Sequence, residues 1–80
     1  MLQINYDRKY ACQQIDKEIE QIKQCHPYGF TRQDQLLIDA ATVQILLGND
    51  EAALELLDKC FGGFFLVQTW ERAAAETKYF

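Results

Sequence analysis

Apolar residues in the first third of the chain recur at the spacing of a single helix face. They fall at intervals of three and four residues, at Cys12, Ile15, Ile19 and Ile22, and Cys25 or His26 closes the series. The positions between them hold glutamines, lysines and acids, which favour helix and face solvent. The pattern predicts an amphipathic helix over residues 5–25, with Asn5 able to cap its first turn.

This apolar stripe is only one residue wide, which leaves two arrangements open. The helix over residues 5–25 can pack within the monomer, which we favour, or against the same helix of a second copy in a homodimer. Small helical proteins with a thin core often gain stability by pairing.

The segment His-Pro-Tyr-Gly-Phe, residues 26–30, interrupts the helical pattern. Pro27 disfavours helical geometry at the residue before it, and Gly29 allows the backbone to reverse. The next four residues, Thr31-Arg-Gln-Asp34, have the spacing of a capping box with Asp in place of Glu. A second helix is therefore expected from residue 32.

The helix predicted over residues 32–47 carries apolar residues around most of its circumference. A helix of this kind is typically buried, so we expect it to be the central element of the fold. Gly48 follows its last leucine, where a left-handed residue can close the helix, and Asn49 or Asp50 can cap the next one. Such a short connection makes the two helices a tight antiparallel hairpin.

Two further amphipathic helices are predicted, over residues 50–61 and 65–78, with Gly62 and Gly63 between them. The first turns Ala53, Leu56, Leu57 and Cys60 inward, and the second turns Leu66, Val67, Trp70, Ala73 and Ala74 inward. No alternation typical of strands is present. The expected fold is one all-α domain over residues 1–80, a compact bundle of about four helices.

Residues 37–61 resemble a single helical hairpin of the tetratricopeptide type. The small residues Ala41 and Ala53 flank Gly48 at the spacing of that family, and residue types at four later positions partly fit: Leu57, Lys59, Cys60 and Phe61. Two positions where the family favours aromatics are polar here, and no second copy in register precedes the hairpin. The resemblance implies a protein that grips a peptide or protein partner, and it assigns no contact residue.

The net charge of −4 limits the classes of partner. Residues 31–60 hold the whole acidic excess, and the bases of the chain are scattered singly. Nucleic acids and anionic membranes select clustered Lys and Arg, so we expect no direct nucleic-acid or membrane binding, and a protein partner of basic character fits better. The apolar run over residues 60–67 is too short to cross a bilayer.

The cysteines do not form a recognisable chemical motif. Cys12, Cys25 and Cys60 are odd in number, and no signal peptide opens the chain, which favours a reducing cytoplasm. With His26 they lack the paired spacing of zinc ligands, and buried thiols explain them better. No paired acids, phosphate loop or nucleophile motif is present, so we expect no enzyme and assign no catalytic, cofactor-binding or metal-binding residue.

Ten aromatic residues in 80 exceed what a small core can easily hide. Around the double glycine, Phe61, Phe64 and Leu66 are expected first as core under the turn and second as a patch for a partner or a second copy. The candidate partner-binding residues are Glu51, Glu55, Asp58, Phe61, Phe64, Phe65, Trp70 and Tyr79.

These features together predict a non-enzymatic protein–protein interaction module. It would act as a small acidic inhibitor or adaptor of a larger complex, of the kind that mobile elements encode. Two alternatives stay open: a regulatory protein that acts on nucleic acid through a partner, and a small cysteine-dependent metal or redox protein.

Overall fold

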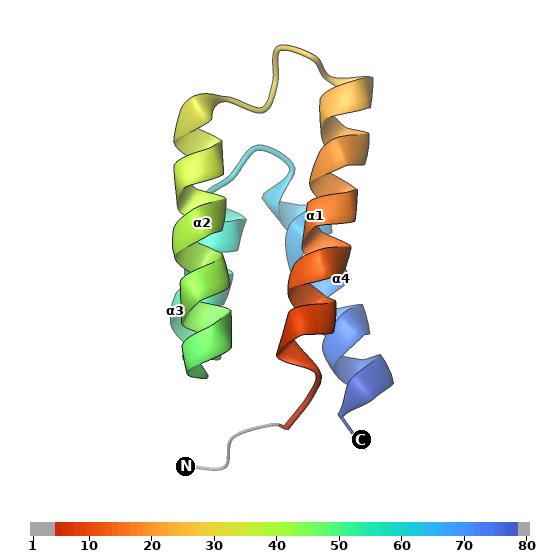
Figure 1. Ribbon diagram of the computed structural model, residues 1–80. Coiled ribbons are helices and arrows are strands. Elements are labelled where there is room, and N and C mark those ends of the chain that lie inside the picture. Colours follow the sequence, from red (N-terminus) through yellow and green to blue (C-terminus); the bar gives the residue numbers. More distant parts are fainter. Residues whose placement is uncertain (1–4, 79–80) are drawn as a thin grey trace.

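A computed structural model describes residues 5–78, which form four α-helices (Figure 1). The helices are α1 (Arg8–Cys25), α2 (Arg32–Leu47), α3 (Asp50–Asp58) and α4 (Gly63–Thr77). No strand occurs among the described residues. Successive helices run in opposite directions, so α1 begins at the end of the molecule where α4 finishes (Figure 1). The predicted all-α fold of four helices is confirmed.

The helices pack as two pairs, α1 with α4 and α2 with α3, joined by smaller contacts of α3 with α4 and of α1 with α2. Each helix contributes one buried stripe to a shared core. The largest fully buried side chains are Ile15, Ile38, Ile45, Leu57 and Leu66. The stripe of α1 packs within the monomer, as favoured from the sequence, and its main neighbour is α4. No helix in residues 5–78 has the length and apolar character needed to cross a membrane.

The expectation that α2 is buried on all sides was wrong. Only Ile38, Ala41 and Ile45 of this helix are buried. Four other apolar side chains are between 51% and 67% exposed, namely Leu36, Val43, Leu46 and Leu47. The physical reason is the small number of elements, because the other three helices cover α2 from one side only and residues 5–78 hold no further helix to cover the other side.

The start of α1 also differs from the expectation. Asp7, and not Asn5, caps the helix, because its side chain accepts a hydrogen bond from the amide of Tyr10 at 2.9 Å. The Asp7 amide in turn donates to the hydroxyl of buried Thr77 at 2.9 Å. The helix therefore begins at Arg8 and its first turn is tied to the last turn of α4.

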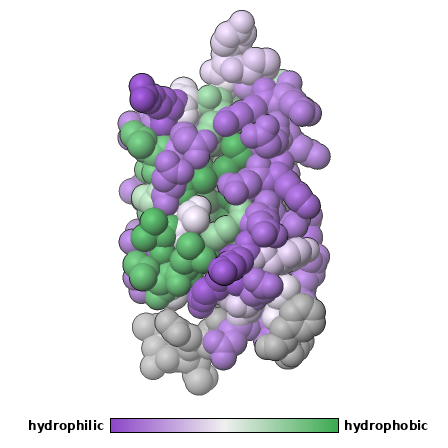
Figure 2. Space-filling model, in the orientation of Figure 1, coloured by the Kyte–Doolittle hydropathy of each residue, from purple (hydrophilic) through white to green (hydrophobic). Residues whose placement is uncertain are grey.

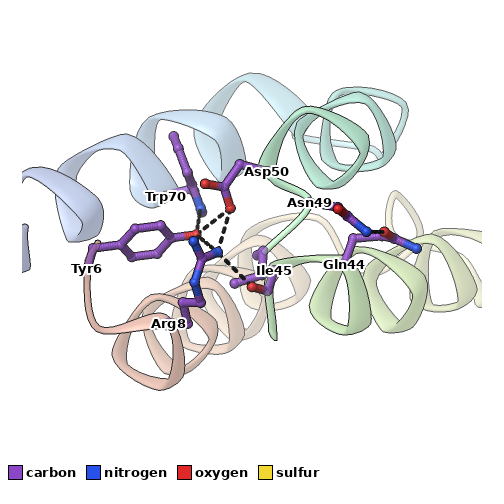
Figure 3. A network of polar contacts seen from close by, with 7 residues as sticks. All are labelled: Tyr6, Arg8, Gln44, Ile45, Asn49, Asp50 and Trp70. Atoms are coloured by element: carbon purple, nitrogen blue, oxygen red, sulfur yellow. Dashed lines mark hydrogen bonds and ion pairs between the residues drawn. The ribbon is translucent and has the colours of Figure 1, made fainter. Parts of the chain in front are cut away.

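The local signals around α2 are confirmed. Thr31 and Asp34 form the predicted capping box, and Gly48 adopts the left-handed conformation with φ 91° at the end of the helix. The Asn49 side-chain amide donates to Gln44 Oε1 at 2.9 Å across the turn (Figure 3). These contacts close the antiparallel α2–α3 hairpin.

The connection between α3 and α4 is built differently from the sequence expectation. Helix α3 ends at Asp58 and α4 already begins at Gly63, so the second glycine is the first residue of a helix. Gly62 has φ 73°, a conformation that side chains disfavour, and a Cβ at Gly63 would lie 2.5 Å from the carbonyl oxygen of Leu57. The two glycines permit a turn in which α4 starts directly against the end of α3.

A polar cluster of Tyr6, Arg8, Ile45, Asp50 and Trp70, here called the clamp, joins all four helices (Figure 3). Arg8 Nη1 donates to Asp50 Oδ1 and to the Ile45 carbonyl oxygen, each at 2.7 Å. The Tyr6 hydroxyl donates to the same carboxylate oxygen at 2.8 Å and accepts from Trp70 Nε1 at 2.9 Å. The clamp thus connects the starts of α1 and α3, the last turn of α2 and the middle of α4.

Burial and the neighbouring Asp50 carboxylate change the pKa of the Tyr6 hydroxyl in the clamp. Burial, reinforced by the hydrogen bond to Asp50, raises the pKa of Tyr6 to about 12. The pKa of the folded state therefore lies above the usual value of 10.0. The protonated hydroxyl stabilises the fold below that value, and this contribution is lost as the pH rises through the folded pKa.

The Tyr6 hydroxyl of the clamp contributes stability that is lost at alkaline pH. Replacing Tyr6→Phe should lower the free energy of unfolding by about 1–2 kcal/mol near neutral pH, because Asp50 and Trp70 lose a partner. The wild-type protein should lose stability between about pH 10 and 12, and the variant should lose less. Urea unfolding followed by circular dichroism measures both, with Tyr28→Phe as the exposed control. If the wild type and Tyr6→Phe lost the same amount of stability at alkaline pH, this result would contradict the role of Tyr6.

Candidate interaction surfaces

Seven of the eight predicted partner-binding residues lie in the described part of the chain, where they form three groups. Glu51, Glu55 and Asp58 are exposed, and their spacing places them on one stripe of α3. Phe61, Phe64 and Phe65 are exposed at the α3–α4 turn. The acidic group and the phenylalanine group therefore both lie on the surface. Trp70 is 7% exposed and belongs to the core and the clamp, so the interpretation of Trp70 as a contact residue is corrected. Tyr79 lies outside the described residues.

The aromatic turn, defined as Phe61, Phe64 and Phe65, is the first candidate surface. These side chains are 40%, 67% and 55% exposed, whereas Leu66 beside them is fully buried. The first expectation, that Phe61 and Phe64 form core under the turn, is therefore wrong. The short turn directs Leu66 inward, so Phe64 and Phe65 fall on the outer side of the first turn of α4, and Phe61 precedes this helix.

A pocket of ≈ 460 Å³ opens between the aromatic turn and the last two turns of α1. Its volume falls in the range of known ligand pockets. The lining residues are Glu18, Gln21, Ile22, Cys25 and His26 from the α1 side and Phe61, Gly62 and Phe65 from the turn. The pocket thus combines two aromatic rings and an isoleucine with a carboxylate, an imidazole and a thiol.

The position of Phe61 at the pocket is set by contacts from three directions. Its ring meets the His26 ring edge-on, with centroids 5.5 Å apart. The ring also passes close to Gly29, where a Cβ would lie 2.4 Å from it. The Phe61 amide donates to Asp34 Oδ1 at 3.2 Å. The glycine of the loop over residues 26–30 therefore makes room for the aromatic wall of the pocket.

Asp34 links the aromatic turn to the cap of α2. Its other carboxylate oxygen accepts from the Thr31 amide at 2.8 Å and from the Thr31 hydroxyl at 3.0 Å. Burial alone would raise the pKa of Asp34, but the hydrogen bonds from the Thr31 and Phe61 amides and from the Thr31 hydroxyl outweigh burial and lower it. One carboxylate thus holds both a helix start and a pocket wall.

The outer face of α2 is a second candidate surface, which sequence reasoning missed. It consists of Leu36, Ala40, Val43, Leu46 and Leu47, all exposed. Figure 2 shows hydrophobic residues gathered over α2, bordered by hydrophilic ones. The signal was present in the sequence as apolar residues on two opposite sides of one helix, and we interpreted it as burial.

The three cysteines lie in different surroundings. Cys25 is exposed at the pocket, and Cys12 is half-buried with a pKa raised by burial and by Asp16. Cys60 is buried, and its thiol donates to the Leu56 carbonyl oxygen at 3.4 Å. Burial, together with Asp34, raises the pKa of Cys60 to about 11. Among the described residues, no three His, Cys, Asp or Glu side chains are grouped as metal ligands would be.

No protein-family model, curated protein or solved structure matches this chain. The similarity of the α2–α3 hairpin to a tetratricopeptide-type unit stays a prediction.

The differing thiol environments predict an order of chemical reactivity. Iodoacetamide should label Cys25 first, Cys12 more slowly and Cys60 only when the protein unfolds, because the thiolate is the reacting form and burial disfavours it. Peptide mass spectrometry over a time course gives the three rates. In urea the three rates should converge, which is the control. Labelling of Cys60 at the rate of Cys25 in the folded protein would contradict the structure.

The double role of Asp34 predicts a measurable loss of stability. Asp34→Ala removes a capping box and the support of Phe61, and it should lower the free energy of unfolding by about 1–2 kcal/mol near neutral pH. Because the pKa of Asp34 is lowered on folding, its contribution is lost as the pH falls below about 4. In that acidic range, the difference in free energy of unfolding between the wild type and Asp34→Ala should shrink.

Asp58→Ala is the matched control, since Asp58 is an exposed acid at the end of α3. Chemical denaturation near neutral pH should give Asp34→Ala a lower free energy of unfolding than this control, and the difference should account for most of the expected loss. Equal stability of the two variants would show that Asp34 supports neither element.

Proposed function

We propose that the protein is a non-enzymatic protein–protein interaction module that binds its partner through the aromatic turn and the adjoining pocket. The observation that carries this proposal is the pocket of ≈ 460 Å³ bounded by exposed phenylalanines. Aromatic side chains are enriched among the residues that dominate binding energy, especially where they flank a pocket. An anchor side chain of a partner would fill this space.

The rigidity of the site supports binding. Phe61 is held by His26, Gly29 and Asp34, so its ring needs little reordering when a partner arrives. A preorganised wall reduces the entropic cost of association. Phe64 and Phe65 contact each other edge-on, with centroids 5.7 Å apart, and extend the apolar rim.

The charges near the site favour a partner with basic residues beside its apolar anchor. Glu18 lines the pocket, and the acidic stripe of Glu51, Glu55 and Asp58 runs along α3 toward the aromatic turn. Complementary charges speed encounter and set orientation. Such a module fits the role of an adaptor or a small inhibitor of a larger complex, and the tetratricopeptide-type resemblance implies a protein that grips a peptide or protein partner.

Site-specific photo-crosslinking tests this proposal. Phe65 is replaced by p-benzoylphenylalanine in cells of the source organism, and the same crosslinker at Gln13, an exposed position early in α1, serves as control. We expect a protein crosslinked from position 65 and not from position 13. This crosslinked protein, once purified, should bind the wild-type chain. The substitution Phe65→Ser or Glu18→Lys should weaken that binding at least about tenfold.

Circular dichroism of the variants keeps the result interpretable, because both residues lie outside the core and the fold should be unchanged. Equal crosslinking from both positions, or binding that neither substitution weakens, would contradict a partner site at the aromatic turn.

A further inference from the structure

The outer face of α2 has the geometry of a helix–helix seam. Leu36, Ala40, Val43 and Leu47 follow one another at intervals of four, three and four residues, which is the alternation of core positions in a coiled coil. Leu46 widens the stripe on one side. The large members are more than half exposed, although the opposite side of the same helix packs Ile38, Ala41 and Ile45 into the core.

We propose that a second copy of this chain covers this face, with the two α2 helices packed antiparallel about a twofold axis. The stripe is about 17 Å long at 1.5 Å per residue, which is enough for successive layers of interdigitating side chains. Each copy would cover the same four half-exposed side chains of the other. A twofold interface requires a self-complementary patch, and this stripe is one.

The charge along the face selects a second copy over a charged partner. The polar positions beside the stripe include Gln33, Gln35 and Gln44, with one base, Arg32, and one acid, Asp39. The α2 positions beside the stripe carry no net charge, and the acids Asp39 and, on the adjoining α1, Asp16 lie at one edge of it, so two acidic copies can approach along the stripe itself with little repulsion. A basic partner would find its complementary charges on α3 instead.

The antiparallel direction follows from the order of side chains and from the ends of the stripe. Opposed helices place Leu36 against Leu47 of the second copy and Ala40 against Val43, so the small residue allows close approach in the middle. In this register Arg32 lies level with the far end of the other α2, where the chain enters α3 with the exposed acid Glu51. A parallel pairing would place Arg32 beside Arg32.

Sedimentation equilibrium across a concentration series tests the dimer. The wild type should be a dimer at high concentration, and Val43→Lys should raise its dissociation constant at least about tenfold with an unchanged circular dichroism spectrum. Phe64→Lys introduces the same charge at an exposed apolar residue elsewhere and should leave the dimer intact. A wild type that stays monomeric, or a dimer that Val43→Lys does not weaken, would overturn the proposal.

Charge exchange tests the direction. Arg32→Glu and Glu51→Arg should each weaken the dimer, and the two substitutions together in one chain should restore it. Two weakening effects that simply add would overturn the antiparallel register. This result is independent of the proposed partner site, because Val43→Lys should leave crosslinking from position 65 unchanged and Phe65→Ser should leave the dimer unchanged.

Discussion

The clamp around the Asp50 carboxylate, which pairs with Arg8 and accepts a hydrogen bond from Tyr6, is the interaction on which the arrangement of the four helices depends. A cation in the first turn of α1 is disfavoured by the helix dipole, but this guanidinium meets the Asp50 carboxylate and a carbonyl at the negative end of α2. Tyr6 and Trp70 partly cover the pair, whose side chains are 19% and 20% exposed. Removing one partner would leave a poorly solvated charge, so the clamp determines which helix ends meet.

The clamp and the core join only the inner faces of the helices, and this determines where binding surfaces can lie. One buried stripe per helix supplies a thin core, as expected for 80 residues. Within the described part of the chain, no further element covers the outer half of α2 or the phenylalanines of the α3–α4 turn. The two surfaces also differ in charge: the aromatic turn adjoins acids, whereas the α2 positions beside its outer face carry no net charge. They therefore suit different occupants.

Short-range signals made much of the fold predictable. The Thr31–Asp34 capping box, the left-handed Gly48 and the helical periodicities each act within a few residues. The clamp was not predictable in this way, because Tyr6 and Trp70 are 64 positions apart. The same limit explains the error at α2: periodicity shows that a residue is apolar, but not whether another element is present to cover it. Exposed Phe61 and Phe65 were among the predicted contacts, whereas the pocket they form with α1 was not.

A double-mutant cycle on Tyr6 and Asp50 tests the central role of the clamp most directly. The free energy of unfolding is measured for Tyr6→Phe, Asp50→Asn, the double variant and the wild type. If the hydroxyl and the carboxylate act together at the junction of the helices, the two substitutions should be coupled by about 1 kcal/mol or more. Additive effects would show that the contact contributes little, and would contradict the account of the fold as one held together at this point.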